Sequence, residues 1–574
     1  MQNRIIVRTL VSLAVGAALG ACHSTEEERT ATPSSANASQ PVPVAANEVS
    51  APGADLAEIQ VTGSRIVRRG ATTAQASQMH RREAYARPMP PPYERTWNSG
   101  ANTENYAALA DNGIKQVNVE PVSTFSIDVD TGSYSNVRRF LASGALPPPD
   151  AVRTEELINY FGYDYPDRAS DAPFSIVTEI APSPWHAGRH LLHIGIEAVE
   201  PDAATERSSN LVFLVDVSGS MNSPDKLDLL KTSLMLLTRQ LSAGDSIAIV
   251  VYAGASGVVL EPTPGNETRA ITNALERLHA GGSTNGAAGI ELAYDLAEEQ
   301  FIEGGINRVL LATDGDFNVG ITDFEALKKL IEAKRKTGIS LTTLGFGTGN
   351  YNDHLMEQLA DAGNGNYAYI DGINEARKVL VDELSSTLQT VAKDVKIQIE
   401  FNPEVVGEYR LVGYENRMLA QEDFNNDRVD AGEIGAGHTV TALYEITLNG
   451  SEGGRSVDPL RYRGDDTRAQ PGADGELAYL KLRYKEPEGN SSRLLEQPLL
   501  VRDITGDVEG TSATYRFAAA VAGFGQLLRG NAALGAFDYD DVLALAAGAR
   551  EDDAFGYRAE FINLVKTAQA LTDN

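Results

Sequence analysis

Cysteine is nearly absent from this chain of 574 residues, in which Cys22 is the single example. One cysteine cannot form a disulfide within the chain, so no bridge stabilises the fold. The eight histidines are scattered, and the sequence contains no His-Glu-x-x-His, no Gly-x-Ser-x-Gly and no P-loop motif. Familiar zinc-protease, serine-hydrolase and P-loop signatures are therefore missing.

Basic residues are also scarce relative to acidic ones. The chain has 49 Lys and Arg against 79 Asp and Glu, for a formal net charge of −30. Such a charge repels phosphate backbones and anionic lipid headgroups. We therefore expect no nucleic-acid partner and no electrostatic adsorption to membranes, and we interpret the acidity as a source of solubility.

No apolar run near the N-terminus is long enough to span a bilayer. Arg4 and Arg8 precede a mostly apolar stretch over residues 10–19, which is about half the length that a transmembrane helix needs. This pattern predicts a secretory signal peptide over residues 1–21. One interpretation is an ordinary signal peptide that is cleaved after Ala21, with Cys22 following it by chance.

The end of that signal, Leu19-Gly20-Ala21-Cys22, resembles a bacterial lipoprotein box. The resemblance implies that Cys22 is acylated and becomes the first residue of a cell-envelope lipoprotein. Several acyl chains on one residue give stable anchoring to a membrane. Residue 24 is Ser rather than the Asp that retains lipoproteins in the inner membrane, so we expect the outer membrane.

Residues 22–120 are rich in Ala, Ser, Thr, Pro and Glu and show no sustained apolar periodicity. They predict a disordered tether whose mean span is on the order of 50 Å. Within it, the segment Glu58-Ile59-Gln60-Val61-Thr62-Gly63-Ser64-Arg65-Ile66 resembles the TonB-box region of outer-membrane receptors. Such a segment binds a partner by strand addition, although no receptor barrel follows it here.

Asp216-Val217-Ser218-Gly219-Ser220 directly follows the apolar run 211–215. Such a run is typical of a strand buried on both faces of a parallel sheet, and ligands bind at the carboxyl edge of such sheets. A carboxylate and two hydroxyls are hard oxygen donors, suited to Mg²⁺, Mn²⁺ or Ca²⁺ rather than zinc. A helix-capping Asp is the alternative interpretation.

The Asp-x-Ser-x-Ser pattern resembles the metal-ion-dependent adhesion site of von Willebrand factor type A domains. That family also uses a Thr from a second loop and an Asp after a later strand, and Thr284 and Asp314 occupy these positions in the expected order. The resemblance implies a metal site built from Asp216, Ser218, Ser220, Thr284 and Asp314. It also implies that the last helix of the domain, over residues 373–388, responds to the ligand.

The segments Phe125-Ser126-Ile127-Asp128-Val129-Asp130-Thr131-Gly132-Ser133-Tyr134 and Leu146-Pro147-Pro148-Pro149-Asp150 resemble the N-terminal region of bacterial YfbK-type proteins. The match runs from about residue 120 to the end. The resemblance indicates the architecture of the protein more clearly than its activity, because that family is largely uncharacterised.

Alternating strand and helix patterns predict a doubly wound, Rossmann-like α/β domain of von Willebrand A type over residues 208–390. The glycines of 345–349 form no complete dinucleotide-binding motif and are explained by a tight turn. An N-terminal family region is expected over 121–207, a β-sandwich-like region over 391–510 and a helical segment over 511–574. Strands before residue 208 can join the sandwich, which would make the A-domain an insertion.

The expected function is that of a non-enzymatic envelope lipoprotein that binds a partner protein through the metal. In the A-domain family, an Asp or Glu of the partner completes the metal's coordination. Two alternatives remain at this stage. One is a metal-assisted hydrolase, for which no base is evident, and the other is an adaptor for an ATP-driven chaperone, which conflicts with the secretion signal.

Overall fold

The structure is a computed structural model that describes residues 104–166, 172–200, 207–283, 286–315, 324–451, 456–457, 475–487, 489 and 491–573. The predicted signal peptide, Cys22, the TonB-box-like segment and Thr284 lie outside these residues. Among the described residues, no helix is long and apolar enough to cross a membrane.

The A-domain is built on a six-stranded sheet in the order β10-β9-β8-β5-β6-β7, in which only β7 runs antiparallel to its neighbour. The strands are β5 (Ser209–Asp216), β6 (Ser246–Tyr252), β7 (Ser256–Pro264), β8 (Ile306–Thr313), β9 (Ser340–Phe346) and β10 (Tyr367–Ile370). All eight residues of β5 are buried, as its continuous apolar run predicts.

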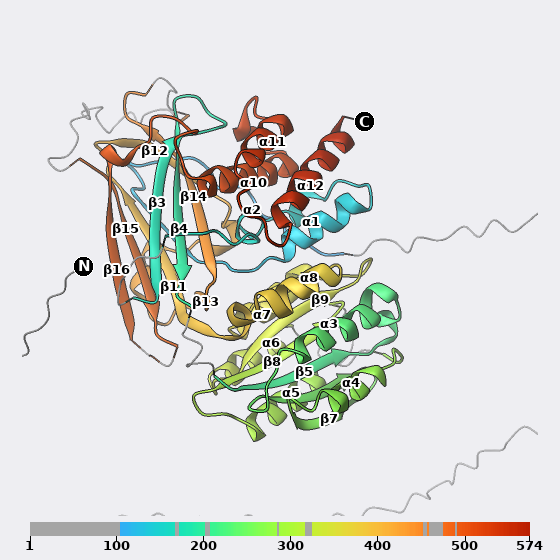
Figure 1. Cartoon of the computed structure of the whole chain (residues 1–574). Helices are drawn as coiled ribbons and strands as arrows, with labels where there is room; N and C mark the ends of the chain where they lie inside the picture. Colours follow the sequence, from blue (N-terminus) through green and yellow to red (C-terminus); the bar gives the residue numbers. More distant parts are fainter. Residues whose placement is uncertain are drawn as a thin grey trace, which may run out of the picture. The chain divides into compact units, whose positions relative to one another are not determined.

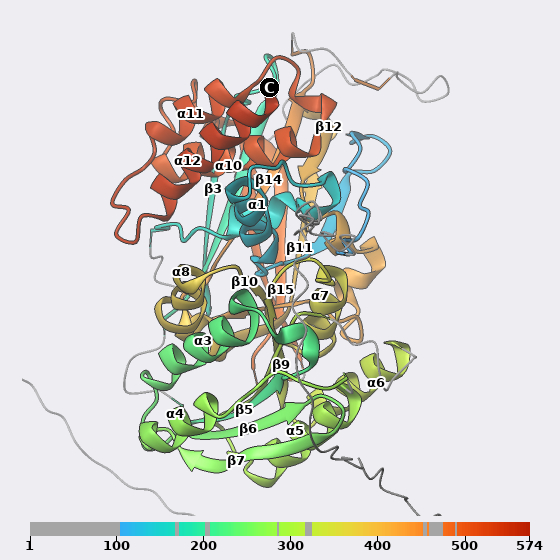
Figure 2. The same ribbon diagram turned by 90° about the vertical axis from the view of Figure 1, so that its right-hand side faces the viewer.

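Alternate residues of β5 pack into different cores. Phe213 and Val215 contact the helices of one face, whereas Val212 and Leu214 contact those of the other. The first face carries α3 (Leu229–Thr238), α4 (Thr268–Glu276) and α8 (Ile373–Arg377), and the second carries α5 (Gly286–Glu299), α6 (Phe324–Arg335) and α7 (Asp353–Ala362). Helices therefore cover both faces, which confirms the doubly wound fold (Figures 1 and 2).

The final A-domain helix differs from the single helix expected over 373–388. It is divided into α8, a π-helical turn (Lys378–Asp382) and α9 (Leu384–Leu388). Lys378 is buried at this turn, where its ammonium lies 4.4 Å from the centre of the Tyr160 ring and pairs with Glu383. The contact with Tyr160, outside the A-domain, thus coincides with an interruption of the regular α-helix.

A β-sandwich surrounds the A-domain in the sequence. One sheet has the order β1-β12-β14-β4-β3, and the other has the order β13-β11-β15-β16 with β2 paired to β11. The first sheet comprises β1 (Lys115–Gln116), β12 (Val406–Val412), β14 (Thr439–Leu448), β4 (His190–Ala198) and β3 (Phe174–Pro182). The second comprises β2 (Val122–Ser126), β13 (Gly432–Gly435), β11 (Thr390–Phe401), β15 (Glu476–Lys485) and β16 (Ser492–Leu500).

The A-domain is an insertion into this sandwich, because β4 precedes it and pairs with β14, which follows it. Both sheets contribute to one apolar core, with Ile194 and Tyr444 from the first sheet and Ile397 and Leu480 from the second. Residues 121–207 therefore do not form a region of their own, and the sandwich expected over 391–510 is completed by strands from before the A-domain (Figure 1).

Helices cover the outer face of the first sheet. They are α1 (Gly132–Ala142), α2 (Thr154–Asn159), α10 (Ala513–Arg529), α11 (Tyr539–Ala547) and α12 (Tyr557–Thr572). Their core includes Val177 and Leu443 from the sheet. Ser512 caps α10 by accepting from the Tyr515 amide, and Asp538 forms a capping box at the start of α11. The predicted C-terminal helical segment is thus confirmed and packs on the sandwich (Figures 1 and 2).

The predicted tether is wrong for its last part. Residues 104–120 are packed against the folded region, since β1 pairs with β12 and Val117 is fully buried. The amide of Asn105 also donates to the carbonyl of Tyr351 at 3.0 Å. These contacts are made largely by backbone groups of a polar segment, so hydrophobic periodicity gives no sign of them.

Candidate metal site

The candidate site lies where two neighbouring central strands end. β5 and β8 are parallel and hydrogen-bonded side by side, so their carboxyl ends bring the Asp216 loop and the Asp314 loop together. The loop after β9, from Gly347 to Asn352, lies beside them. The chain thus assembles the site from three separate loops, the first of which lies about a hundred residues before the second.

Asp216 is fully buried and held in one orientation. Its Oδ1 accepts a hydrogen bond from the Ser218 amide at 2.8 Å, and its Oδ2 accepts from the Thr313 hydroxyl at 2.8 Å. Burial raises the pKa of Asp216 to about 6. Thr313 was not singled out from the sequence, although its position before Asp314 at the end of a strand is a usable signal.

The hydroxyls of the two predicted serines lie side by side. Ser218 Oγ and Ser220 Oγ lie 2.9 Å apart. Adjacent ligands of an octahedral Mg²⁺ at 2.0–2.1 Å are separated by about 3.0 Å. Their spacing therefore matches two neighbouring positions around one small cation, and both oxygens are neutral.

The loop that leads to Thr284 docks directly on the Asp216 loop. Gly281 N donates to Val217 O at 2.7 Å, and Gly219 N donates to Gly282 O at 3.0 Å. Gly282 has φ +92°, a conformation that favours glycine. Thr284 itself is outside the described residues, so its place among the ligands stays a prediction.

Asp314 is buried and already holds a cation from the chain itself. The ammonium of Lys226 lies 2.9 Å from Asp314 Oδ2 and 2.7 Å from Asn350 Oδ1, and Asn350 Nδ2 donates to the same Asp314 oxygen at 3.1 Å. The Lys226 side chain is only 7% exposed. Neither Lys226 nor Asn350 was identified from the sequence.

Glycine at position 347 makes room for this lysine. Gly347 has φ +79°, and a Cβ there would lie 2.2 Å from Cε of Lys226. The glycines of this turn were expected to permit a tight strand-to-helix connection. They do so, and one of them also provides the passage through which Lys226 reaches Asp314.

The donor set fits a hard divalent cation. It contains two carboxylates and the serine hydroxyls, which favour Mg²⁺, Mn²⁺ or Ca²⁺. Within the part of the chain that the structure describes, no group of three or more His, Cys, Asp or Glu side chains is placed to hold a metal. One oxygen of Asp314 is already engaged by the ammonium of Lys226.

The end of the predicted tether contacts the third loop of the site. Glu104 Oε1 accepts from the Gly349 amide at 2.8 Å and from Arg139 Nη1 at 2.9 Å. Gly349 directly precedes Asn350, which bonds Asp314. Glu104, which the sequence predicts to lie in the tether, therefore helps to fix the loop that supports the site.

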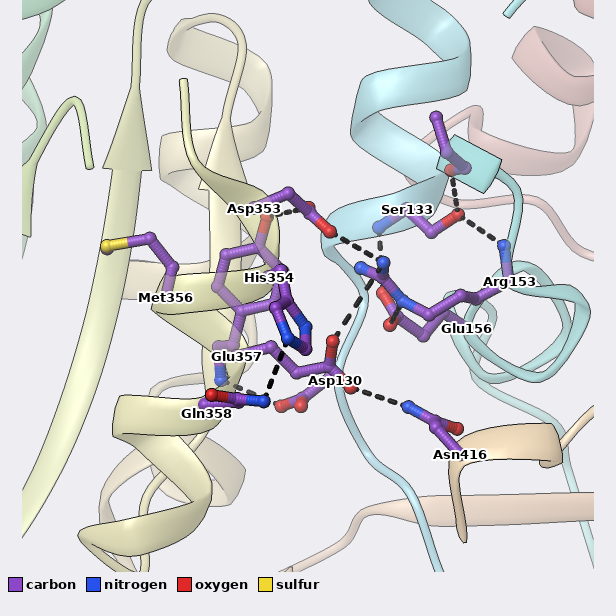
Figure 3. A network of polar contacts seen from close by, with 12 residues as sticks. Asp130, Ser133, Arg153, Glu156, Asp353, His354, Met356, Glu357, Gln358 and Asn416 are labelled. Carbon is purple, nitrogen blue, oxygen red and sulfur yellow. Dashed lines mark hydrogen bonds and ion pairs between the residues drawn. The ribbon is translucent and has the colours of Figure 1, made fainter. Parts of the chain in front are cut away.

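A buried polar network holds the helix that follows this loop (Figure 3). Arg153, at the start of α2, donates through Nη1 to Asp353 Oδ2 of α7 at 2.6 Å and through Nε to Glu156. Glu357 of α7 accepts from Asn416 at 2.6 Å. The loop bearing Asn350 is thus fixed from outside the A-domain.

The parallel sheet with its antiparallel edge strand and the Asp-x-Ser-x-Ser loop together define a von Willebrand factor type A domain. The family model for that domain, "von Willebrand factor type A domain", matches residues 210–381. A second model, "von Willebrand factor", matches residues 100–193, and a third, "Uncharacterized protein YfbK, C-terminal", matches residues 386–571.

The chain belongs to the YfbK family. It is 49% identical over 478 residues to "Uncharacterized protein YfbK" of Escherichia coli strain K12, and the match covers 82% of each chain. It is 28% identical over 313 residues to "Uncharacterized protein sll0103" of Synechocystis, covering 54% of this chain and 69% of that one.

More distant likenesses include human inter-alpha-trypsin inhibitor heavy chain H3, at 24% identity over 42% of this chain and 29% of the relative. Among solved structures, a von Willebrand factor type A protein from Catenulispora acidiphila has a TM-score of 0.39 at 15% identity, covering 69% of this chain and 91% of the other. The A-domain fold assignment rests on the chain's own topology and on the family models.

Proposed function

We propose that this protein is a lipid-anchored envelope protein whose A-domain holds a divalent cation and uses it to bind an acidic side chain of a partner protein. The observation that carries the proposal is the convergence of Asp216, Ser218, Ser220 and Asp314 at the carboxyl edge of the sheet. Gly219, between the two serines, is exposed at this edge.

The charge of the donors supports a binding role. Bound there, Mg²⁺, Mn²⁺ or Ca²⁺ would supply the attraction for a carboxylate of the partner. Ser218 and Ser220 contribute neutral oxygens, and Asp314 already shares its charge with Lys226. The chain therefore neutralises a divalent cation incompletely, which leaves a role for an anionic group from outside.

The anchor completes the proposal. Acylation at Cys22 would fix the protein to the outer membrane, and residues 23–103 would let the folded region reach partners away from the lipid surface. The segment at 58–66 would offer a further site for strand addition. Because the chain is acidic, it would not attract an acidic partner directly. A cation bound at the site would mediate the contact instead.

Calorimetry with Mg²⁺ and Mn²⁺ tests the metal site. Asp216→Ala and Thr284→Ala should each abolish binding, whereas Asp295→Ala, which alters an exposed carboxylate on α5, should leave it unchanged. Affinity capture from envelope extracts should then recover a partner with Mg²⁺ but not with a chelator. Unchanged metal binding in both site variants would refute the assignment.

A further inference from the structure

A cavity of about 210 Å³ lies at the edge of the A-domain sheet opposite the metal site. It is bordered by the first residues of β8 and β9, by Leu388 at the end of α9, and by Thr390 at the start of β11. The cavity therefore lies at the point where the chain leaves the A-domain and re-enters the sandwich.

The charged residues that line this cavity are mostly basic, in contrast to the acidic chain as a whole. They are Arg207, Arg308, Arg335, Lys393, Glu303 and Glu433. Four basic side chains thus face two acidic ones. Low-dielectric walls concentrate the field of such a cluster and raise the local concentration of anions.

The guanidinium of Arg308 is buried in the wall of this cavity. Arg308 is only 3% exposed, yet its Nε has no hydrogen-bond partner. Its other nitrogens donate to neutral groups, with Nη1 to Thr342 Oγ1 at 2.6 Å and Nη2 to Leu388 O at 3.3 Å. Among the described residues, no carboxylate forms an ion pair with it.

A buried guanidinium without an anion is costly, since its charge has left water without compensation. Burial accordingly lowers the pKa of Arg308 to about 10. Glu433 is the nearby carboxylate, but its removal from solvent raises its pKa to about 8, so it is mostly protonated at neutral pH. Asn364 donates to Glu433 Oε1 at 2.6 Å and holds it in place.

Arg335 is already engaged by Asp430 and by Asn364 Oδ1 at 2.8 Å. Lys393 lies on β11 of the sandwich and also lines the cavity. Arg308 and Lys393 thus belong to different parts of the molecule, the A-domain and the sandwich. An anion between them would connect the A-domain with the sandwich.

We propose that this cavity binds a small multivalent oxyanion, such as inorganic phosphate or a compact polycarboxylate, between Arg308 and Lys393. The cavity has room for several water molecules and therefore for an anion of this size. Guanidinium groups bind phosphate and carboxylate through paired hydrogen bonds, and the free Nε of Arg308 supplies one of them.

Binding is measured by calorimetry on the full folded protein in buffer freed of divalent cations by a chelating resin. Inorganic phosphate, sulfate and citrate are titrated separately, each against chloride at equal ionic strength. This arrangement keeps the metal site out of the measurement, so a failure here leaves the proposed metal-dependent function untouched. A preference for phosphate or for citrate identifies which class of oxyanion the cavity takes.

We expect saturable binding of phosphate or citrate by the unaltered protein, weakened at least tenfold by Lys393→Met and by Arg308→Met. Lys393→Met keeps the test valid if removal of the buried arginine impairs folding. Lys329→Met removes an exposed lysine of α6 and is the matched control. Equal loss of affinity in the control, a response that chloride reproduces, or no saturable binding of any of the three anions would overturn the proposal.

Discussion

Lys226 gives the site a positive charge of its own. Its ammonium contacts Asp314, the carboxylate that the A-domain resemblance assigns to the metal, at 2.9 Å. A divalent cation drawn to the same oxygen must share it with the lysine or displace it. Lys226 therefore opposes metal binding and at the same time stabilises the metal-free protein.

Replacing Lys226 with Met should reverse this balance. Without the ammonium, Asp314 remains buried and unneutralised, and we expect the metal-free protein to lose about 3–5 kcal/mol of stability, as when one partner of a buried pair is removed. Mg²⁺ should restore that stability, so its effect on the melting temperature should exceed that in the unaltered protein. Thermal unfolding with and without Mg²⁺ measures both effects.

Lys231→Met on α3 provides the control, since it removes the same charge from a neighbouring helix. If Lys226→Met responds to Mg²⁺ no more strongly than this control does, the lysine is not a competitor for the metal.

At the scale of single residues, the sequence identifies candidate oxygen donors but not the groups that orient them. Short motifs at strand ends contain Asp216, Ser218, Ser220 and Asp314. Such motifs can be recognised from the sequence alone. Lys226 and Asn350 reach Asp314 from positions 88 and 36 residues away, so only the folded chain brings them together. Thr313 directly precedes the predicted Asp314 but was not itself predicted to belong to the site.

At the scale of elements, Arg138 of α1 clamps the end of the A-domain. It donates through Nε and Nη2 to both oxygens of Asp371, at 2.7 and 2.5 Å, and through Nη2 to Glu375 of α8 at 2.7 Å. Tyr160 also donates to Glu375 at 2.8 Å. Any shift of α8 in response to a ligand at the metal would have to break these buried contacts.

We expect Arg138→Leu to lower the free energy of unfolding by about 3–5 kcal/mol, because it leaves Asp371 and Glu375 buried without their cation. Urea denaturation followed by circular dichroism measures the change. Arg377→Leu, which alters an arginine whose side chain is 59% exposed, should cost less than about 1 kcal/mol. Similar losses in the two variants would contradict the clamp.

The elements missed from the sequence share a physical cause. β7 and β16 are edge strands that contain proline, at Pro262 and Pro264 in one and Pro498 in the other. Proline cannot donate to a strand neighbour and normally argues against a strand, but an edge tolerates it. The buried strand β5 was predicted correctly because a continuous apolar run marks it.

At the scale of the whole molecule, pH should change how firmly the A-domain is held. The folded-state pKa of Glu433 is raised to about 8, so the folded protein retains a proton that the unfolded chain releases near pH 4.5. The stabilising contribution of that proton is complete below about pH 4.5 and is lost as the pH rises to about 8. The slope for one such group is up to about 1.4 kcal/mol per pH unit.

Glu433→Gln cannot ionise, so its melting temperature should fall less between pH 5 and pH 8 than that of the unaltered protein. Calorimetric scans at unit intervals of pH provide the comparison. Glu303→Gln, at an exposed position on the same cavity, should retain the full slope. Parallel slopes in all three proteins would show that Glu433 does not titrate in this range.

The proposed anchor also acts on the whole molecule. Cys22→Ser should abolish labelling with radioactive palmitate and release the protein from the membrane fraction. Label that persists in Cys22→Ser would exclude this cysteine as the site of lipidation.

The insertion of the A-domain has a consequence for how the chain folds during synthesis. His193 of β4 pairs with Leu443 of β14, 250 positions later. At ribosomal rates of about 5–20 residues per second, that interval lasts roughly 10–50 s. Throughout it, the β4 edge that pairs with β14 stays open, and the A-domain reaches its complete sequence only at about residue 390, shortly before β14 is made. The nascent chain therefore carries an aggregation-prone strand edge while the A-domain is made, and the completion of the sandwich must wait for its second half.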